Sequence, residues 1–228
     1  MATWDEYQGR VTRAFDEWHG TDRDVRSFLN FGLRASNSTY DRLWKEAEKQ
    51  PAWDGGPELP DLFHDRIDGL WPHDFGWMLM AAVLKDGVTA FEVYLEQAME
   101  EMLRAHGYSA AEYTNTRTPS WEGITDFYKR ALGVHLKGEQ RLRDVRRLRN
   151  ILTHKRGGLR TDEDRERFGK DEDGWIRDHV QLTTESTLNH LDVLERQVRR
   201  ADPLIDPVAW AGATPDGFLE YIKELTAP

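Results

Sequence analysis

Apolar residues recur at intervals of three and four positions along most of the chain, which is the spacing of a helix with one buried face. The longest such segment covers residues 74–106, where an apolar stripe extends from Trp77 to Met102 and Gly107 ends the pattern. Shorter segments with this spacing cover residues 3–18, 21–33, 40–49, 121–132, 138–154, 179–200 and 218–225. Because apolar and polar residues nowhere alternate over the length of a strand, the sequence predicts an all-α fold, built as a helical bundle.

Turn-forming residues separate these predicted helices. His19-Gly20 and Asn37-Ser38 predict breaks near the N-terminus, and the polar stretch 159–174 predicts a loop. Residues 50–60 are rich in proline and glycine and form the strongest candidate boundary, while Pro203 predicts the end of the preceding helix. We therefore expect an N-terminal helical extension, a helical core and a short C-terminal helix packed on that core, with the bounds 1–60, 61–201 and 202–228.

The composition indicates a cytoplasmic protein. The chain has no cysteine, which excludes disulfides and thiolate metal sites and favours a reducing compartment. The N-terminus lacks the apolar core of a signal peptide. The longest nearly uncharged apolar run, residues 75–84, is about half of the roughly 20 residues that a membrane span needs. We therefore expect no membrane association.

Charge is distributed unevenly along the chain. The formal net charge of −10 argues against a protein that coats nucleic acid non-specifically. Residues 137–160 nevertheless carry a net charge of +7, and residues 162–173 follow with seven carboxylates against three basic side chains. The short connection holds the acidic segment at high effective concentration beside the basic one. We therefore expect the acidic segment to cover part of the basic surface and to compete with an anionic ligand.

The basic segment is itself amphipathic. On a helical wheel of residues 142–154, the apolar side consists of Leu142, Val145, Leu148, Ile151 and Leu152. The opposite side consists of Arg143, Arg146, Arg147, Asn150 and His154. Arg149 is the exception, because its position lies inside the apolar stripe. A partly buried guanidinium cannot lose its charge, so it requires a carboxylate, a phosphate or a subunit interface beside it, and Glu92 and Glu96 are candidate partners.

Residues 142–154 resemble the signature of the HEPN superfamily, the "higher eukaryotes and prokaryotes nucleotide-binding" domain. The hallmark of this family is an arginine, commonly followed by a polar residue, with a histidine shortly after it. Arg149, Asn150 and His154 fill these places here. Residues 90–95 and 179–200 also resemble the family's helices before and after the motif. The resemblance implies a HEPN-like helical core that forms a homodimer, in which two motifs share one cleft.

The resemblance further implies an activity. Many HEPN proteins are metal-independent endoribonucleases without a cofactor, found among toxins, antiviral effectors and stress responses, where an inhibitory partner protein can control them. Other members have lost activity and serve as binding modules. Arg149, Asn150 and His154 are all present in this chain, so its motif fits the active class.

These residue types suit the cleavage of RNA. RNA carries its own nucleophile, the 2′-hydroxyl, and a histidine with an ordinary pKa of about 6.5 can take or donate a proton near neutral pH. We expect His154 to be the acid–base group, Arg149 to stabilise charge on the phosphoryl oxygens, and Asn150 to orient His154 or bind a phosphate. The expected product is a 2′,3′-cyclic phosphate. Expected auxiliary or RNA-contacting residues are Glu92, Arg143, Arg146, Arg147 and Lys155.

Each assignment has a structural alternative. His154 near a helix end can simply interact with the helix dipole, and Arg149 can serve only to pair with a carboxylate of the long helix. The exposed arginines can be a solvated face, and the chain is then a catalytically inactive dimer that binds a partner protein, nucleotide or RNA. A metal site at His64 and His73, which lie among aspartates, is disfavoured because the spacing matches no standard ligand pattern.

Overall fold

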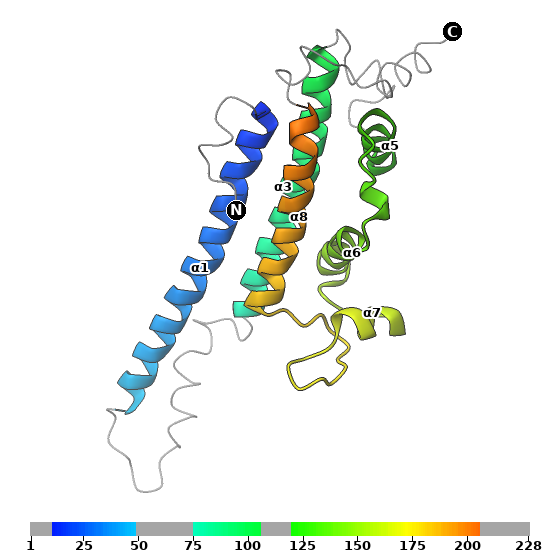
Figure 1. Cartoon of the computed structure of the whole chain (residues 1–228). Helices are drawn as coiled ribbons and strands as arrows, with labels where there is room; N and C mark the ends of the chain where they lie inside the picture. The colour runs from blue at the N-terminus through cyan, green and yellow to red at the C-terminus, as the bar shows by residue number, and fades with distance from the viewer. Residues whose placement is uncertain (1–10, 49–74, 106–119, 206–228) are drawn as a thin grey trace, which may run out of the picture.

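The computed structural model describes residues 11–48, 75–105 and 120–205 of the chain. Within these ranges the chain forms helices α1 (Arg13–Glu48), α3 (Phe75–Ala105), α5 (Trp121–Leu132), α6 (Gln140–Lys155), α7 (Asp162–Phe168) and α8 (Thr184–Ile205), with a 3-10 turn η2 (Leu136–Gly138) between α5 and α6. The β-structure in these ranges is limited to two isolated bridges. The predicted all-α fold is therefore confirmed (Figure 1).

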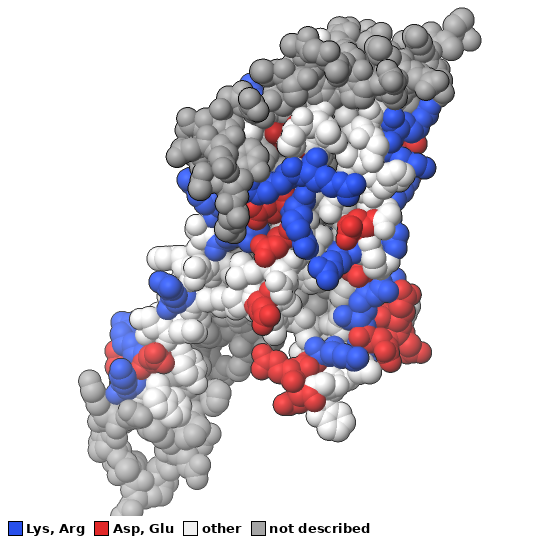
Figure 2. Space-filling view, in the orientation of Figure 1, with Lys and Arg blue, Asp and Glu red and all other residues white. Residues whose placement is uncertain are grey.

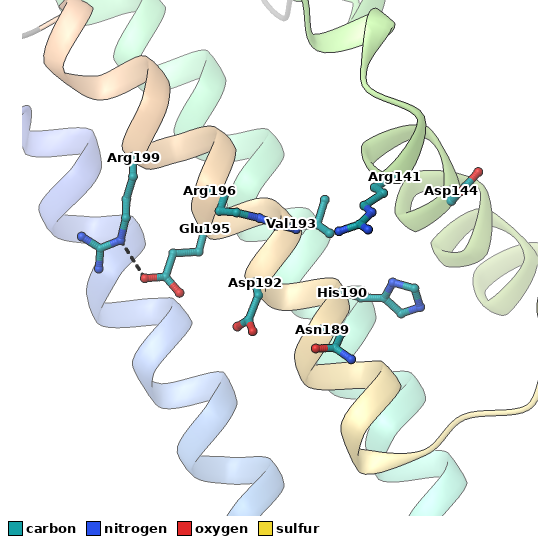
Figure 3. A pocket seen from close by; sticks show the side chains of 9 residues that line it. All are labelled: Arg141, Asp144, Asn189, His190, Asp192, Val193, Glu195, Arg196 and Arg199. Carbon is teal, nitrogen blue, oxygen red and sulfur yellow. Dashed lines mark hydrogen bonds and ion pairs between the residues drawn. The ribbon is translucent and has the colours of Figure 1, made fainter. Parts of the chain in front are cut away.

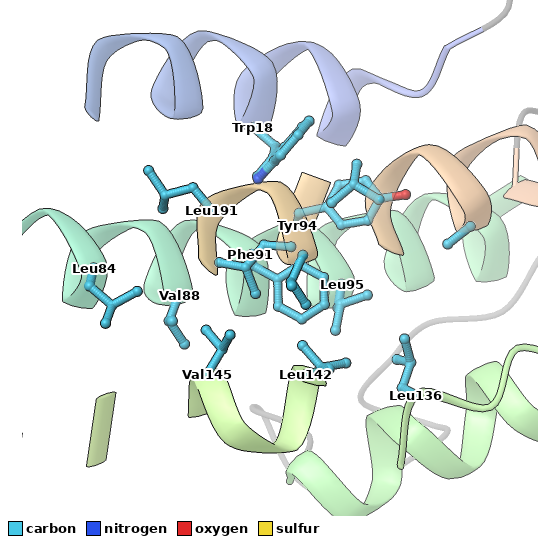
Figure 4. Close-up of a cluster of buried hydrophobic side chains, with 14 of the residues drawn as sticks. Trp18, Leu84, Val88, Phe91, Tyr94, Leu95, Leu136, Leu142, Val145 and Leu191 are labelled. Carbon is cyan, nitrogen blue, oxygen red and sulfur yellow. The ribbon is translucent and has the colours of Figure 1, made fainter. Parts of the chain in front are cut away.

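Helix α3 forms the centre of the core. It is in contact with α1, α5, α6 and α8, and Figure 1 shows it between α1 on one side and α5 and α6 on the other. Large side chains from these helices meet around Phe91 (Figure 4), and all of those labelled there are almost completely buried. A side chain at Gly87 would collide with Leu191 of α8, so glycine allows α3 and α8 to approach closely.

Helix α1 is continuous, and the breaks predicted at His19-Gly20 and Asn37-Ser38 are wrong. The helix is capped by Thr12, whose hydroxyl accepts a hydrogen bond from the Phe15 amide at 2.9 Å. Weak helix formers such as glycine and asparagine cost at most about 1 kcal/mol each, which packing of the helix against α3 offsets. The part of the predicted helix 3–18 that precedes residue 11 lies outside the described residues.

The polar stretch 159–174 is not a simple loop, because it contains the short helix α7. Thr161 caps this helix by accepting a hydrogen bond from the amide of Asp164 at 3.1 Å. Three acidic residues then occupy the first turn, where they complement the helix dipole. The loop prediction was wrong because the helix has few apolar residues and therefore shows no hydrophobic period.

Helix α8 is shifted toward the C-terminus relative to the prediction of residues 179–200. It begins at Thr184, where Thr183 and Ser186 exchange hydrogen bonds between side chain and backbone at 3.0 Å. It continues to Ile205 and includes Pro203 in its last turn. A proline so close to the end removes only one helical hydrogen bond, so the predicted stop came too early.

Several predictions lie outside the described residues. They are the boundary at 50–60, the helix at 218–225, and the disfavoured metal site at His64 and His73. Where the N-terminal region is described, α1 packs along α3 of the core. No helix in the described ranges is long and apolar enough to cross a membrane.

Candidate functional site

Helix α6 carries the Arg–Asn–His motif, and its apolar side lies as the helical wheel predicts. All five predicted apolar positions are buried in the core. The helix ends directly after the motif, where Arg156 and Gly157 adopt positive φ angles of 50° and 84°. A Cβ atom at Gly157 would lie 2.7 Å from the ring of Trp77, so a glycine is required here. Trp77 therefore fixes the end of α6 that bears His154.

Arg149 pairs with Glu92, one of the candidate partners that its place in the apolar stripe suggested. Its Nη2 atom lies 2.5 Å from Oε2 of Glu92. The second oxygen of this carboxylate, Oε1, accepts a hydrogen bond from Nε of Arg146 at 2.9 Å. The three side chains are 20–24% exposed, so one carboxylate joins two partly buried guanidinium groups and ties α6 to α3.

Glu96, the other candidate partner, makes no ion pair with Arg149 among the described residues. Burial raises the pKa of Glu96 above its ordinary value, and the negative charge of Glu92 raises it further. The charge of Glu92 is thus the one that holds the motif arginine.

Arg146 is further positioned by an aromatic ring. Its guanidinium carbon lies 3.4 Å from the ring centre of Trp121, the first residue of α5. This stacking is a cation–π contact and links α5 to α6 next to the motif. No role was predicted for Trp121 from the sequence, although its position at the start of a short predicted helix before the motif was a signal for one.

A cavity of about 760 Å³ lies along the exposed side of α6. It brings together the predicted residues Arg143, Arg146, Arg147, Asn150, His154 and Lys155. Arg149 is not among its lining residues. Arg149 instead donates a hydrogen bond from Nη1 to Oδ1 of Asn150 at 3.1 Å, so the asparagine connects the Glu92 pair with the cavity.

His154 is exposed at this cavity. Within the described part of the chain, its imidazole has no hydrogen-bond or ion-pair partner. His154 lies in the last turn of α6, as the alternative of an interaction with the helix dipole requires, but it donates no hydrogen bond to a carbonyl among the described residues. Its side chain is available to a ligand that enters the cavity.

The acidic helix α7 lies against the basic helix α6, in agreement with the predicted covering of the basic surface. Nε of Arg147 lies 2.6 Å from Oδ1 of Asp164, and Nη1 of Arg147 donates a hydrogen bond to Glu163 at 3.0 Å. Asp164 is buried and also lines the cavity of His154. Figure 2 shows acidic and basic side chains mixed at the position of α7. One of the predicted RNA-contacting arginines is thus occupied by carboxylates.

No group of three or more potential metal-ligating side chains occurs among residues 11–48, 75–105 and 120–205. Comparison of the chain with protein-family models, with curated proteins and with solved structures finds no match. The interpretation of the motif therefore depends on the residues and contacts described above.

Proposed function

We propose that this chain is a metal-independent RNA endonuclease of HEPN type, with His154 as its acid–base residue. The observation that carries the proposal is the cavity along α6, in which the exposed imidazole lies among cationic side chains. Cationic side chains attract the phosphates of RNA, and an imidazole without a protein partner is free to exchange a proton with a substrate. The proposal includes a cytoplasmic location and a role in a toxin, antiviral-defence or stress system.

The proposed reaction uses the 2′-hydroxyl of RNA as the nucleophile. An imidazole removes the proton of this hydroxyl, the oxygen attacks the adjacent phosphorus, and the bond from phosphorus to the 5′-oxygen breaks. A protonated imidazole supplies the proton that the leaving 5′-oxygen takes up. The products are a 2′,3′-cyclic phosphate and a 5′-hydroxyl end. Asn150 is proposed to bind a phosphate oxygen through its amide N–H groups, because its Oδ1 is engaged by Arg149.

A homodimer is part of the proposal. Within one chain Arg149 is held by Glu92 and does not line the cavity of His154. A second copy that places its own motif opposite the first would bring the two arginines and two histidines to one cleft, where one imidazole acts as base and the other as acid. Light scattering is expected to show a dimer at micromolar concentration. A monomer at concentrations where RNA is cleaved would exclude this shared cleft.

The decisive experiment compares histidine variants on structured RNA in the presence of EDTA. The parent is expected to cleave, and His154→Ala is expected to lose about 10²–10⁴ in rate. The matched control is His135→Ala, which removes another exposed histidine that does not line the cavity. Cleavage by His154→Ala at the parental rate would refute the proposed mechanism. End-group analysis must also find the 2′,3′-cyclic phosphate.

A catalytically inactive binding module is the second candidate function. The engagement of Arg149 by Glu92 favours it, because the motif arginine already has a carboxylate partner. The carboxylates of α7 at the cavity also favour it, since they repel a phosphate backbone. If the parent binds RNA but leaves it intact, while His154→Ala binds equally well, the binding module is the correct interpretation.

A further inference from the structure

A second hollow, of about 690 Å³, lies between α6 and α8. It shares no lining residue with the cavity of His154. Figure 3 shows side chains of both helices turned toward it, with Val193 between the basic groups. Val193 is 5% exposed, so the basic groups lie over an apolar floor.

The acidic residues of this hollow are already engaged. Asp144 accepts a hydrogen bond from Arg167 at 2.7 Å. Asp192 and Glu195 both pair with Arg26 of α1, at 2.7 and 3.3 Å. Figure 3 shows the carboxylate of Asp144 turned away from the other side chains. Among the described residues, none of these carboxylates pairs with Arg141 or Arg196.

Two arginines of the hollow are unpaired among the residues that the structure describes. Arg141 of α6 and Arg196 of α8 are exposed, and neither makes an ion pair or hydrogen bond within the described ranges. Their guanidinium groups extend toward each other from the two helices (Figure 3). Two positive charges that lie close together repel each other. An anion bound between them offsets this repulsion, because each guanidinium group is attracted to it. The arrangement is that of a receptor for an anion.

His190 and Asn189 also line the hollow and are neutral hydrogen-bond donors. Burial lowers the pKa of His190 below its ordinary value, with the charge of Asp144 acting in the opposite direction. The imidazole is therefore uncharged at neutral pH and carries one N–H donor. The amide of Asn189 provides two more N–H donors.

We propose that this hollow binds a phosphate dianion, carried by a small phosphomonoester or by the 5′-phosphate end of an RNA strand. Planar guanidinium groups bind phosphate oxygens in pairs, and two positive charges match the charge of the dianion. The volume lies within the range of about 300–1,000 Å³ that is usual for small-ligand sites. The proposal does not depend on RNA cleavage, because it concerns other residues.

The test measures binding by titration calorimetry with ribose 5-phosphate, with ribose as the probe that lacks the phosphate. Saturable binding of ribose 5-phosphate alone is expected, weakened about tenfold by Arg141→Gln or by Arg196→Gln. Arg200→Gln is the matched control, because it removes an exposed arginine of α8 that does not line the hollow. Circular dichroism verifies that each variant is folded.

A second arm identifies the source of the phosphate. It compares 2′-O-methylated oligonucleotides that carry a 5′-phosphate or a 5′-hydroxyl, since this modification prevents cleavage. Stronger binding of the phosphorylated strand, lost in Arg141→Gln and Arg196→Gln, supports an RNA end. Binding of ribose 5-phosphate alone supports a small ligand. No saturable binding of either phosphate probe, or an equal loss in Arg200→Gln, would overturn the proposal.

Discussion

Replacing Glu92 by glutamine is the sharpest test of how the motif is held. Glu92 binds Arg149 through one carboxylate oxygen and Arg146 through the other. Glutamine keeps the shape of the side chain and one acceptor oxygen, but it removes the negative charge. Two partly buried guanidinium groups then lie close together without a counter-charge, and the stability of the fold is expected to fall.

The size of the effect follows from burial. Exposed ion pairs contribute at most about 1 kcal/mol, whereas breaking a fully buried pair costs about 3–5 kcal/mol. The side chains of Glu92, Arg146 and Arg149 are 20–24% exposed, which places them between these limits. We expect a loss of about 2–3 kcal/mol in the free energy of unfolding. At about 2–4 °C per kcal/mol, Tm falls by about 4–12 °C.

The assay is thermal unfolding followed by circular dichroism, with Glu96→Gln as the matched control. Glu96 lies one turn further along α3, and burial followed by the charge of Glu92 raises its pKa. When the pKa of a carboxyl group is raised in the folded state, its ionisation lowers the stability of the protein. That stability returns as the pH falls through the folded-state pKa. Glu96→Gln is therefore expected to leave Tm at neutral pH unchanged or slightly higher. Equal Tm values for Glu92→Gln and the parent, or equal losses in both variants, would refute the reasoning.

Three further predictions concern other contacts. Arg149→Ala is expected to abolish RNA cleavage while the fold survives, because Glu92 keeps Arg146 as a partner; cleavage assays and circular dichroism check both. Glu163→Gln removes one of the two carboxylates that hold Arg147, the other being Asp164, and is expected to tighten RNA binding and to steepen its salt dependence. Glu166→Gln alters an exposed residue without a described partner and is expected to have a smaller effect; affinities measured at several salt concentrations check both. Asp202→Ala is expected to lower the free energy of unfolding, measured by urea denaturation, by about 2–3 kcal/mol, because this buried carboxylate accepts hydrogen bonds from Thr12, which caps α1, and from Tyr94 of α3.

The sequence predicted the positions that depend on helical spacing. The buried side of α6 follows from angles along a single helix and is confirmed. The same angles placed Arg149 in the apolar stripe but left its partner open among a carboxylate, a phosphate and a subunit interface, and the structure shows the carboxylate. The choice between Glu92 and Glu96 was left open, because it depends on how far α6 slides along α3. That offset is set by packing around Phe91, to which several helices contribute.

Features that depend on several helices at once were not predicted. Arg141 and Arg196 are 55 positions apart, and only the rotation of α6 against α8 turns them toward one hollow. Helix α7 was missed because its stability comes from the Thr161 cap and from ion pairs, which leave no hydrophobic period. The same helix places Asp164 at the cavity of His154. The charges along the sequence predicted that the acidic segment covers part of the basic surface, but not which carboxylate reaches the cavity.

The double engagement of Glu92 has a consequence for how this protein can diverge. One carboxylate pairs with both Arg146 and Arg149, so substitutions at these three positions are energetically coupled. A substitution at one position changes how far substitutions at the other two destabilise the fold. Descendants that lose Glu92 are expected to lose Arg146 or Arg149 as well. Either substitution can come first, and the protein with only one of them is expected to be less stable. Arg143 donates hydrogen bonds to the carbonyl of Lys137 and to the side chain of Gln140, so it lies outside this unit. Substitutions among relatives of this chain are therefore expected to be correlated at positions 92, 146 and 149, and not between these positions and 143.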